Sequence, residues 1–224
     1  MIDFYFHSGP NPMKVALMLE ETGLPYQMIP VDIFKGDQHI PAFTALNPNA
    51  KVPVIVDDGE IVFDSNAILL YLEEKTGQFG ATAGSSRGEL LSWLMFIATG
   101  LGPYSGQAVH FVKFAPEKLP YAINRYTKEA ERHLEILDAR LADRSFILGE
   151  NCSIVDFAAW GWVNFAPGIV GEAFPSLTHL RRWHETMNTR PAAARAIALR
   201  DTLKLKSDID DETRRALFGR TMAL

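Results

Sequence analysis

Three short polar stretches in the first 66 residues carry the side chains best suited to chemistry. They read HSGPN (residues 7–11), KVP (residues 51–53) and DSN (residues 64–66); the first and third follow an apolar segment, and the second precedes one. The amide of Asn11 is a hydrogen-bond donor, and the N-terminus of a helix lowers the pKa of a thiol placed beside it. The first stretch could therefore stabilise a thiolate.

The other two stretches could bind parts of an extended peptide. If Pro53 follows a cis bond, the backbone N–H and C=O of Val52 face outward and could pair with such a peptide as an added strand. The helix N-terminus predicted at Asp64 and Ser65 would bind a carboxylate, helped by the serine hydroxyl. Each stretch also has a purely structural interpretation, with Pro53 as the first residue of a strand and Asn11, Asp64 and Ser65 as helix caps.

The elements that would position these residues form a βαβ unit followed by a hairpin and a helix. Residues 2–6 and the segment that begins at Tyr26 are rich in aromatic and branched side chains, as strands are. Between them, Asn11 as N-cap, Pro12 at the first helical position and Gly23 after the last turn predict a helix. A short helical piece at PAFTALNP then precedes two apolar runs joined by DDGE, and an amphipathic helix follows DSN. The predicted order is βαβ-α-ββα.

The rest of the chain is expected to be helical. Apolar residues recur at a spacing of three to four in GELLSWLMFIAT, YAINRYTKEAERHLEILDARLA, SIVDFAAWGWV and SLTHLRRWHETMN. The stretch TGQFGATAGSSRGE (residues 76–89) is rich in glycine and small residues, which indicates a boundary. We therefore expect a first domain at residues 1–79, a linker at 80–86 and an all-helical domain at 87–224.

Composition excludes several classes of function. The net charge is −5, with 22 basic and 27 acidic residues, and no basic stripe suited to nucleic acid is present. No apolar run reaches membrane-spanning length and no basic leader precedes MIDFYF, so we expect a cytoplasmic protein without a membrane partner. The only cysteine is Cys152, which leaves no disulfide framework and no cysteine-rich metal site. A reacting thiol would have to come from outside the chain.

Taken together, these motifs resemble a cytosolic glutathione transferase. The resemblance rests on NPNAKVPVIVDDG, VFDSNAILLYLEEKTG, the helical second half, the capping box of Ser153 and Asp156 in SIVDFAAW, and FPSLTHLRRWHETMNTRPA. More narrowly, PNPMKV, KGDQ, LNPNAKVP and GLGPYSGQAVHF resemble the bacterial Nu-class enzymes, which include disulfide-bond reductases. The resemblance implies a thioredoxin-like N-terminal domain with a cis-proline, a helical-bundle C-terminal domain, a homodimer, and glutathione as substrate without a metal.

The resemblance also implies roles for particular residues. The backbone of Val52, beside Pro53, would pair with the cysteinyl part of glutathione, and Asp64 and Ser65 would bind its γ-glutamyl end. Gln38 and Lys51 match positions that contact the remaining polar groups of the tripeptide.

The first turn departs from the Nu-class pattern. That pattern has threonine or serine two residues before the asparagine, where this chain has Gly9. Ser8 is one position away, although a shift of one residue reverses the direction of a side chain. We therefore expect Asn11, helped by free backbone N–H groups and with Ser8 as a second candidate, to stabilise the sulfur of glutathione.

The second substrate is expected between the two domains. Tyr104, His110 and Phe111 in GPYSGQAVHF are candidate pocket residues, with Trp162 as a further wall, but aromatic side chains at helical spacing also form cores. Arg125 and Arg132 share one helix and face either glutathione or solvent.

The function expected from these features is attack of the glutathione thiolate on disulfides or small electrophiles. Because Gly9 removes a hydroxyl, a catalytically weak binding or regulatory module is the alternative. A domain that acts only in protein assembly is a third possibility.

Overall fold

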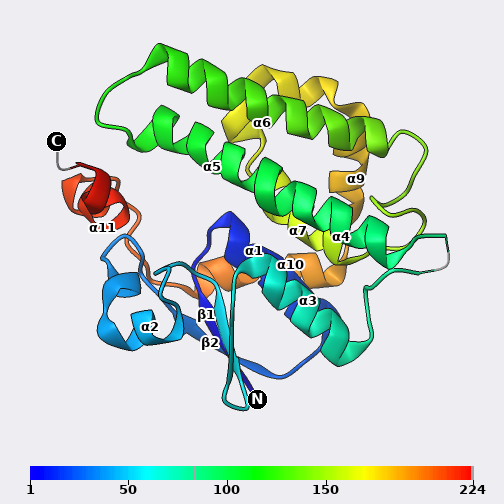
Figure 1. Ribbon diagram of the computed structural model, residues 1–224, viewed down its shortest axis with the longest axis horizontal. Helices are drawn as coiled ribbons and strands as arrows, with labels where there is room; N and C mark the ends of the chain where they lie inside the picture. Colours follow the sequence, from blue (N-terminus) through cyan, green and yellow to red (C-terminus); the bar gives the residue numbers. More distant parts are fainter. Residues whose placement is uncertain (83, 223–224) are drawn as a thin grey trace.

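The computed structural model describes residues 1–82 and 84–222, which form a small mixed sheet with helices and a larger helical region (Figure 1). The Val52–Pro53 bond is cis, as expected. The sheet part contains the predicted elements in the predicted order, with one additional 3-10 turn. It runs β1 (Ile2–Phe6), α1 (Pro10–Thr22), β2 (Tyr26–Pro30), η1 (Asp37–His39), α2 (Pro41–Leu46), β3 (Val54–Asp57), β4 (Glu60–Phe63) and α3 (Ser65–Thr76).

The sheet brings three chain segments to one edge. Its strand order is β2-β1-β3-β4, with β1 parallel to β2 and antiparallel to β3, and β3 antiparallel to β4. Val54, at the start of β3, pairs with Tyr5 near the end of β1 and with Phe63 at the end of β4. The segments that follow β1 and β4 and the one that precedes β3 therefore meet at the same edge.

The first helix begins two residues earlier than the sequence suggested. Pro10 is the first residue of α1 and Gly9 is its N-cap, so the expectation that Asn11 caps the helix is wrong. Both prolines suit the first turn, where a missing N–H costs nothing, and local preference alone did not distinguish Pro10 from Pro12. The helix ends at Gly23, whose φ of 67° is the left-handed conformation that glycine adopts readily.

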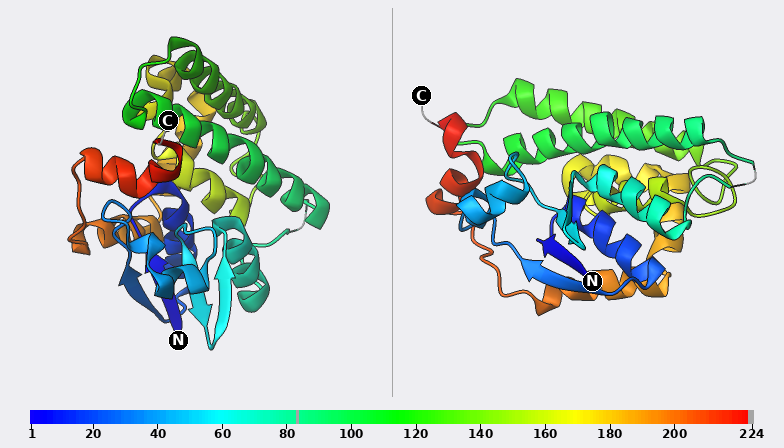
Figure 2. Two further views of the ribbon diagram at one scale, coloured as in Figure 1. Left: turned by 60° about the vertical axis from the view of Figure 1, so that its left-hand side comes forward. Right: turned by 60° about the horizontal axis from the view of Figure 1, so that its bottom comes forward.

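The second part of the described chain contains helices only, apart from one isolated bridge between Phe146 and Gly149. In Figure 1, α5 (Gly102–Val109) and α6 (Pro120–Arg140) lie side by side at the top, and Figure 2 shows α11 (Asp211–Met222) returning to the side of α2. The segments are α4 (Arg87–Phe96), η2 (Ile97–Leu101), α5 (Gly102–Val109), η3 (His110–Phe114), α6 (Pro120–Arg140), α7 (Ile154–Val163), α8 (Pro167–Val170), η4 (Gly171–Ser176), α9 (Thr178–Asn188), α10 (Pro191–Ala198), η5 (Leu199–Thr202) and α11 (Asp211–Met222).

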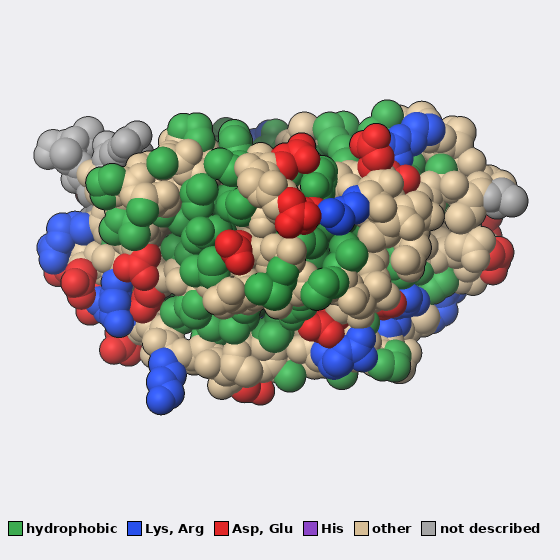
Figure 3. Space-filling model, turned by 90° about the horizontal axis from the view of Figure 1, so that it is seen from below, with side chains coloured by type: hydrophobic (Ala, Val, Ile, Leu, Met, Phe, Trp, Pro, Cys, Tyr) green, Lys and Arg blue, Asp and Glu red, His purple; other side chains and the backbone are tan. Residues whose placement is uncertain are grey.

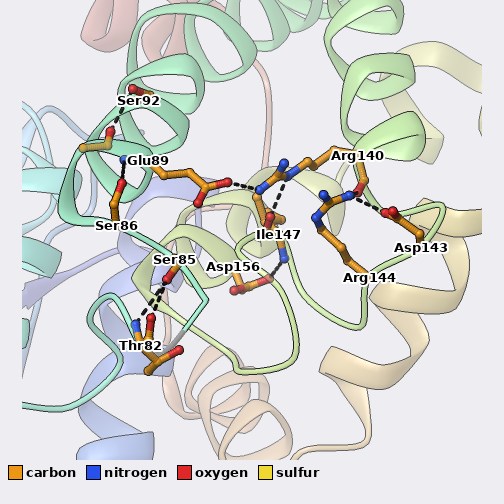
Figure 4. A network of polar contacts seen from close by, with 11 residues as sticks. Thr82, Ser85, Ser86, Glu89, Ser92, Arg140, Asp143, Arg144, Ile147 and Asp156 are labelled. Carbon is orange, nitrogen blue, oxygen red and sulfur yellow. Dashed lines mark hydrogen bonds and ion pairs between the residues drawn. The ribbon is translucent and has the colours of Figure 1, made fainter.

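Helix α7 joins the helical region to the sheet part. All of its residues are buried, and it packs against α1. The predicted capping box is present: Ser153 and Asp156 satisfy each other's backbone donors. Figure 4 shows Asp156 accepting a hydrogen bond from the backbone of Ile147, whose carbonyl binds Arg140, which also pairs with Glu89 of α4. This network fixes the start of α7 and with it the support behind α1.

Apolar side chains are not confined to the core. They are widespread on the underside of the molecule, with acidic and basic groups scattered among them (Figure 3). The large exposed apolar side chains of the described chain include Ile61 and Phe63 on β4 and Leu91 and Met95 on α4. Part of the surface is therefore suited to contact with another apolar surface.

Candidate functional site

A cavity of about 480 Å³ lies at the sheet edge where the three polar stretches meet. All three stretches contribute to it, and so does the part of the loop before β3 that precedes KVP. Its lining consists of Asn11, Asn47, Asn49, Lys51, Val52, Pro53, Phe63, Asp64 and Ser65. The structure therefore brings together six of the residues singled out from the sequence: Asn11, Lys51, Val52, Pro53, Asp64 and Ser65.

The loop before β3 is shaped by Asn47. This side chain is only 2% exposed; its amide donates to the carbonyl of Lys51 at 2.7 Å, and its oxygen accepts from the backbone N–H of Asn49 at 3.0 Å. The loop is thus held from its inner side, and Lys51 and Val52 follow in fixed positions. The Lys51 side chain is exposed and has no ion pair among the described residues, so it places a positive charge at the rim of the cavity.

Asp64 combines a capping role with a free oxygen. Its Oδ1 accepts from the backbone N–H groups of Asn66 at 2.8 Å and Ala67 at 3.3 Å, so the capping role is confirmed for Asp64, whereas Ser65 is the first helical residue and not the cap. No described residue donates to Oδ2, which leaves a carboxylate oxygen for an ammonium group. Asp64 has a φ of 70°, a conformation that non-glycine residues rarely adopt and that clusters at functional sites.

Ser65 is the first residue of α3 and is buried, with its side chain on the cavity wall. Its hydroxyl lies beside the N-terminus of a 12-residue helix, where backbone N–H groups and the helix dipole favour an anion. Asp64 and Ser65 therefore offer sites for a cation and an anion next to each other. That pair of charges is what the free end of an α-amino acid carries.

Asn11 lies in the first turn of α1 and faces the same cavity. Its side chain makes no hydrogen bond to the described residues, so the amide remains able to donate to a ligand. Pro10 and Pro12 have no N–H and the N–H of Met13 donates to Gly9, so the backbone N–H of Asn11 and the positive end of the helix dipole are what the first turn of α1 adds. A thiolate placed here would gain from both.

Two of the predicted contact residues do not line the cavity. Gln38 is 4% exposed, and its amide donates to the backbone carbonyls of Ile33 and of Ala216 in α11. Ser8 lies next to Gly9 but does not reach the cavity wall. The structure thus separates these two residues from the six that it brings together.

The candidate residues for a second substrate pack with one another and with helical neighbours. Phe111 stacks on Tyr126 with ring centroids 5.2 Å apart, and Tyr104 lies against His133 at 5.3 Å. His110 contacts Phe111 and Phe218 of α11, and burial lowers its pKa. Trp162 is 9% exposed and belongs to the core.

The two arginines of α6 are occupied by a carboxylate on the same helix. Arg125 and Arg132 both pair with Glu129, at 2.9 Å and 2.6 Å, and both remain about half exposed. Hydrogen bonds from these two arginines lower the pKa of Glu129 to about 2. The pattern favours the solvated interpretation of this helix face.

The described residues contain no reactive thiol and no cluster of side chains arranged to bind a metal ion. Burial, with the charge of Asp156, raises the pKa of Cys152 well above its usual value, so this thiol is kept protonated. No group of three or more His, Cys, Asp or Glu side chains is arranged to hold a metal ion. Within the same residues, no helix has the length and apolarity needed to cross a bilayer.

The sequence interpretation missed several residues at the site. Asn47, Asn49 and Phe63 line the cavity, and the asparagines stand within the motif LNPNAKVP, whose spacing was a usable signal. His7 and Lys14 are buried, and Lys14 reaches the cavity residue Ser65 from behind; nothing in their local sequence indicated this.

Comparison with known proteins gives consistent matches over nearly the whole chain. Residues 8–75 match the family model of the glutathione S-transferase N-terminal domain, and residues 101–191 match that of the C-terminal domain. The chain is 41% identical over 221 residues to the disulfide-bond oxidoreductase YfcG of Escherichia coli, covering 95% of this chain and 98% of that protein. It is 38% identical to the disulfide-bond oxidoreductase YghU of the same organism, covering 87% of this chain and 73% of that protein.

Two solved structures extend the comparison to ligands. A glutathione transferase family member from Pseudomonas fluorescens with two glutathione molecules bound has a TM-score of 0.83 at 36% identity, covering 88% of this chain and 92% of its own. A glutathione transferase from Pseudomonas putida with one glutathione disulfide per subunit has a TM-score of 0.81 at 35% identity, covering 88% of this chain and 90% of its own.

Proposed function

The chain belongs to the glutathione S-transferase family, and from this we propose that it is an enzyme that activates the glutathione thiolate for attack on disulfides. The observation that carries the proposal is the cavity at the sheet edge. It joins a helix N-terminus with a free amide, a strand-edge backbone, and an adjacent carboxylate and hydroxyl. The disulfide-bond oxidoreductases among its relatives support the choice of disulfides over other electrophiles.

The cavity residues match the groups of the tripeptide one by one. The γ-glutamyl ammonium would bind the free oxygen of Asp64, and the carboxylate beside it would bind Ser65 and the N-terminus of α3. The cysteinyl main chain would pair with the backbone of Val52, and the glycyl carboxylate would meet the charge of Lys51. This arrangement directs the sulfur to Asn11 and the start of α1.

The reaction follows from thiolate chemistry. The thiolate of glutathione attacks one sulfur of a disulfide, the S–S bond breaks, and the other sulfur leaves as a thiolate that takes a proton from solvent. The mixed disulfide is then attacked by a second glutathione thiolate. The second step releases oxidised glutathione and the other reduced thiol, so that two glutathione molecules supply the two electrons.

The protein contributes position and pKa but no nucleophile of its own. Cys152 lies in the segment before α7, and it is kept protonated by burial. The proposed chemistry therefore needs no protein disulfide, and replacement of Cys152 should leave the turnover step intact.

A catalytically weak binding module is the second candidate, and one observation favours it. Gly9 caps α1 without a hydroxyl at the position where the resemblance leads us to expect one. Turnover of a small disulfide with glutathione, measured by coupling the oxidised product to glutathione reductase, separates the two candidates. Catalysis that saturates in glutathione supports the enzyme, whereas binding of glutathione without turnover supports the module.

We further propose a homodimer in the cytoplasm, with domains at residues 1–79 and 87–224. The edge strand β4 exposes Ile61 and Phe63 by 44% and 42%, and α4 exposes Leu91 and Met95 by 37% and 43%. Leu91 and Met95 are four residues apart and so share one helix face, and the Arg87–Glu73 ion pair joins α4 to α3, which packs on β4. The proposed location fits the proposed substrate, because the cytoplasm contains a pool of glutathione.

A further inference from the structure

Lys14 is a buried lysine without a carboxylate partner. It lies in α1, its side chain is 1% exposed, and no carboxylate of the described residues is in ion-pair contact with it. Lysine is almost never fully buried unless it is paired, because removing its charge from water is costly. The negative partner that Lys14 lacks would therefore have to be part of a ligand.

The Lys14 side chain runs between α1 and α7 where these two helices pack together. The chain of Lys14 passes Gly161, where an added Cβ would lie 2.6 Å from Lys14 Cγ and would also collide with the carbonyl of Pro10. Only glycine leaves room for the side chain to cross this contact. The Nζ atom then reaches Ser65, to whose hydroxyl oxygen it donates at 3.3 Å.

The bond from Lys14 determines what Ser65 can offer. Because the hydroxyl oxygen accepts from Nζ, its own proton is free to point into the cavity that Ser65 lines. That proton, the N-terminus of α3 and the ammonium behind them all favour an anion at the same place. On the proposed function, this anion is the carboxylate of the γ-glutamyl group.

We propose that Lys14 is a positioning residue which holds the Ser65 hydroxyl toward the γ-glutamyl carboxylate and takes up a proton from solvent when that carboxylate binds. This inference rests on the proposed function of the cavity. It adds the amine of Lys14, which lies behind the cavity wall at Ser65 and is only partly protonated until the ligand binds.

The electrostatics of the ligand-free protein agree with this role. Burial lowers the pKa of Lys14 to about 7, and the charge of Asp64 partly opposes that effect. Near neutral pH the amine is therefore only partly protonated, and a carboxylate arriving at Ser65 would raise its pKa. Other charges on the packed elements have partners of their own: Glu20 with Arg195, Glu21 with Arg190, Asp156 with Ser153 and Trp183, Glu73 with Arg87, and Lys75 with Asp57.

The test is calorimetric binding of S-methylglutathione, which has the γ-glutamyl end but no ionisable thiol. At about pH 8, above the free pKa of Lys14, the binding enthalpy of the unmodified protein should depend on the ionisation enthalpy of the buffer and should show net proton uptake. Affinity should fall as the pH rises above about 7 and should be nearly constant below it.

The Lys14→Met variant assigns the proton, since His7 also has a pKa lowered by burial. This variant keeps an unbranched side chain in the channel past Gly161 and should lose the proton uptake, with binding weakened about tenfold. With glutathione as substrate, KM should rise while kcat is retained. Lys51→Met is the matched control: it removes an exposed lysine that does not contact Ser65, so it should weaken binding but keep the uptake.

The outcomes separate this inference from the proposed function. Binding with equal enthalpy in all buffers would overturn the role of Lys14 while leaving the glutathione site in place. Uptake that persists in Lys14→Met would do the same. No binding of S-methylglutathione to the unmodified protein would overturn both. If Lys14→Met does not fold, a His7→Gln variant decides the question: proton uptake that persists without His7 supports Lys14, and uptake that is lost assigns the proton to His7 and overturns the role of Lys14.

Discussion

The ring nitrogen Nδ1 of His7 faces Gly9, and it lies 3.8 Å from the position that a Cβ on residue 9 would occupy. This nitrogen is buried and has no hydrogen-bond partner among the described residues. Gly9 has a φ of −77°, which any residue can adopt, so its lack of a side chain is not required by the backbone. The site therefore has both the space and a polar neighbour for a hydroxyl at position 9.

Gly9→Ser should raise the rate of glutathione-dependent disulfide reduction. The added hydroxyl can accept from His7 and donate toward the thiolate, and one such bond shifts a pKa by about one unit. We expect turnover at neutral pH to increase several-fold, measured with a small disulfide at saturating glutathione.

Gly9→Ala is the control for this substitution. It adds the Cβ, which meets nothing closer than 3.8 Å, but no hydroxyl. Equal rates for the serine and alanine variants would show that a hydroxyl at position 9 does not act on the sulfur.

Asp64→Asn should weaken glutathione binding without destabilising the protein. Asparagine caps a helix as well as aspartate and tolerates a positive φ, so the bonds to Asn66 and Ala67 are kept. The charge that would hold the γ-glutamyl ammonium is lost, and affinity measured by calorimetry should fall about tenfold or more. An unchanged affinity would remove Asp64 from the binding site.

Asp64→Ala separates the two roles of this residue. It removes the cap as well as the charge, which costs about 1 kcal/mol of unfolding free energy. Its melting temperature should therefore fall, while that of Asp64→Asn should stay close to the parent value.

The stability of the ligand-free protein should rise with pH between about 7 and 9 because of Lys14. The folded state holds this amine at a pKa of about 7, whereas the unfolded chain has the ordinary value of about 10.4. In that interval the unfolded chain binds more protons, so the free energy of unfolding increases with pH, by up to a few kcal/mol. Denaturant titrations should show this slope in the parent protein and a smaller one in Lys14→Met.

Charge on the exposed apolar residues of β4 and α4 should dissociate the proposed homodimer. Ile61→Lys combined with Met95→Lys places two cations in the proposed interface, where unpaired charge is costly to bury. Light scattering should report a monomer. Ile197→Lys, which changes an exposed apolar residue of α10, should leave the dimer intact. A monomeric parent protein would contradict the proposed assembly.

The sequence was sufficient for the features that depend on local signals. The strands, the hairpin, the Ser153–Asp156 capping box and the helix end at Gly23 were all predicted, because each is specified by a few adjacent residues. The start of α1 was misplaced because Pro10 and Pro12 both satisfy the preferences of a first turn.

Burial that depends on residues far away in the chain could not be predicted from the sequence. The buried amide of Gln38 donates to a carbonyl of Ala216, 178 residues later in the chain, and no pattern near Gln38 indicates that contact. Lys14 would ordinarily face solvent on a short helix, but Gly161 of α7 gives it a buried path to Ser65. His7 is likewise buried by its neighbours, Phe34 among them, and not by its own sequence context.

The most direct test of the central claim is an ultraviolet titration of the thiolate of bound glutathione, in the parent protein and in Asn11→Ala. We predict a thiol pKa clearly below the usual value of about 8.5 in the parent, and a value about one unit higher in the variant. A bound thiol that titrates like free glutathione in the parent protein would contradict the claim that the start of α1 activates the sulfur.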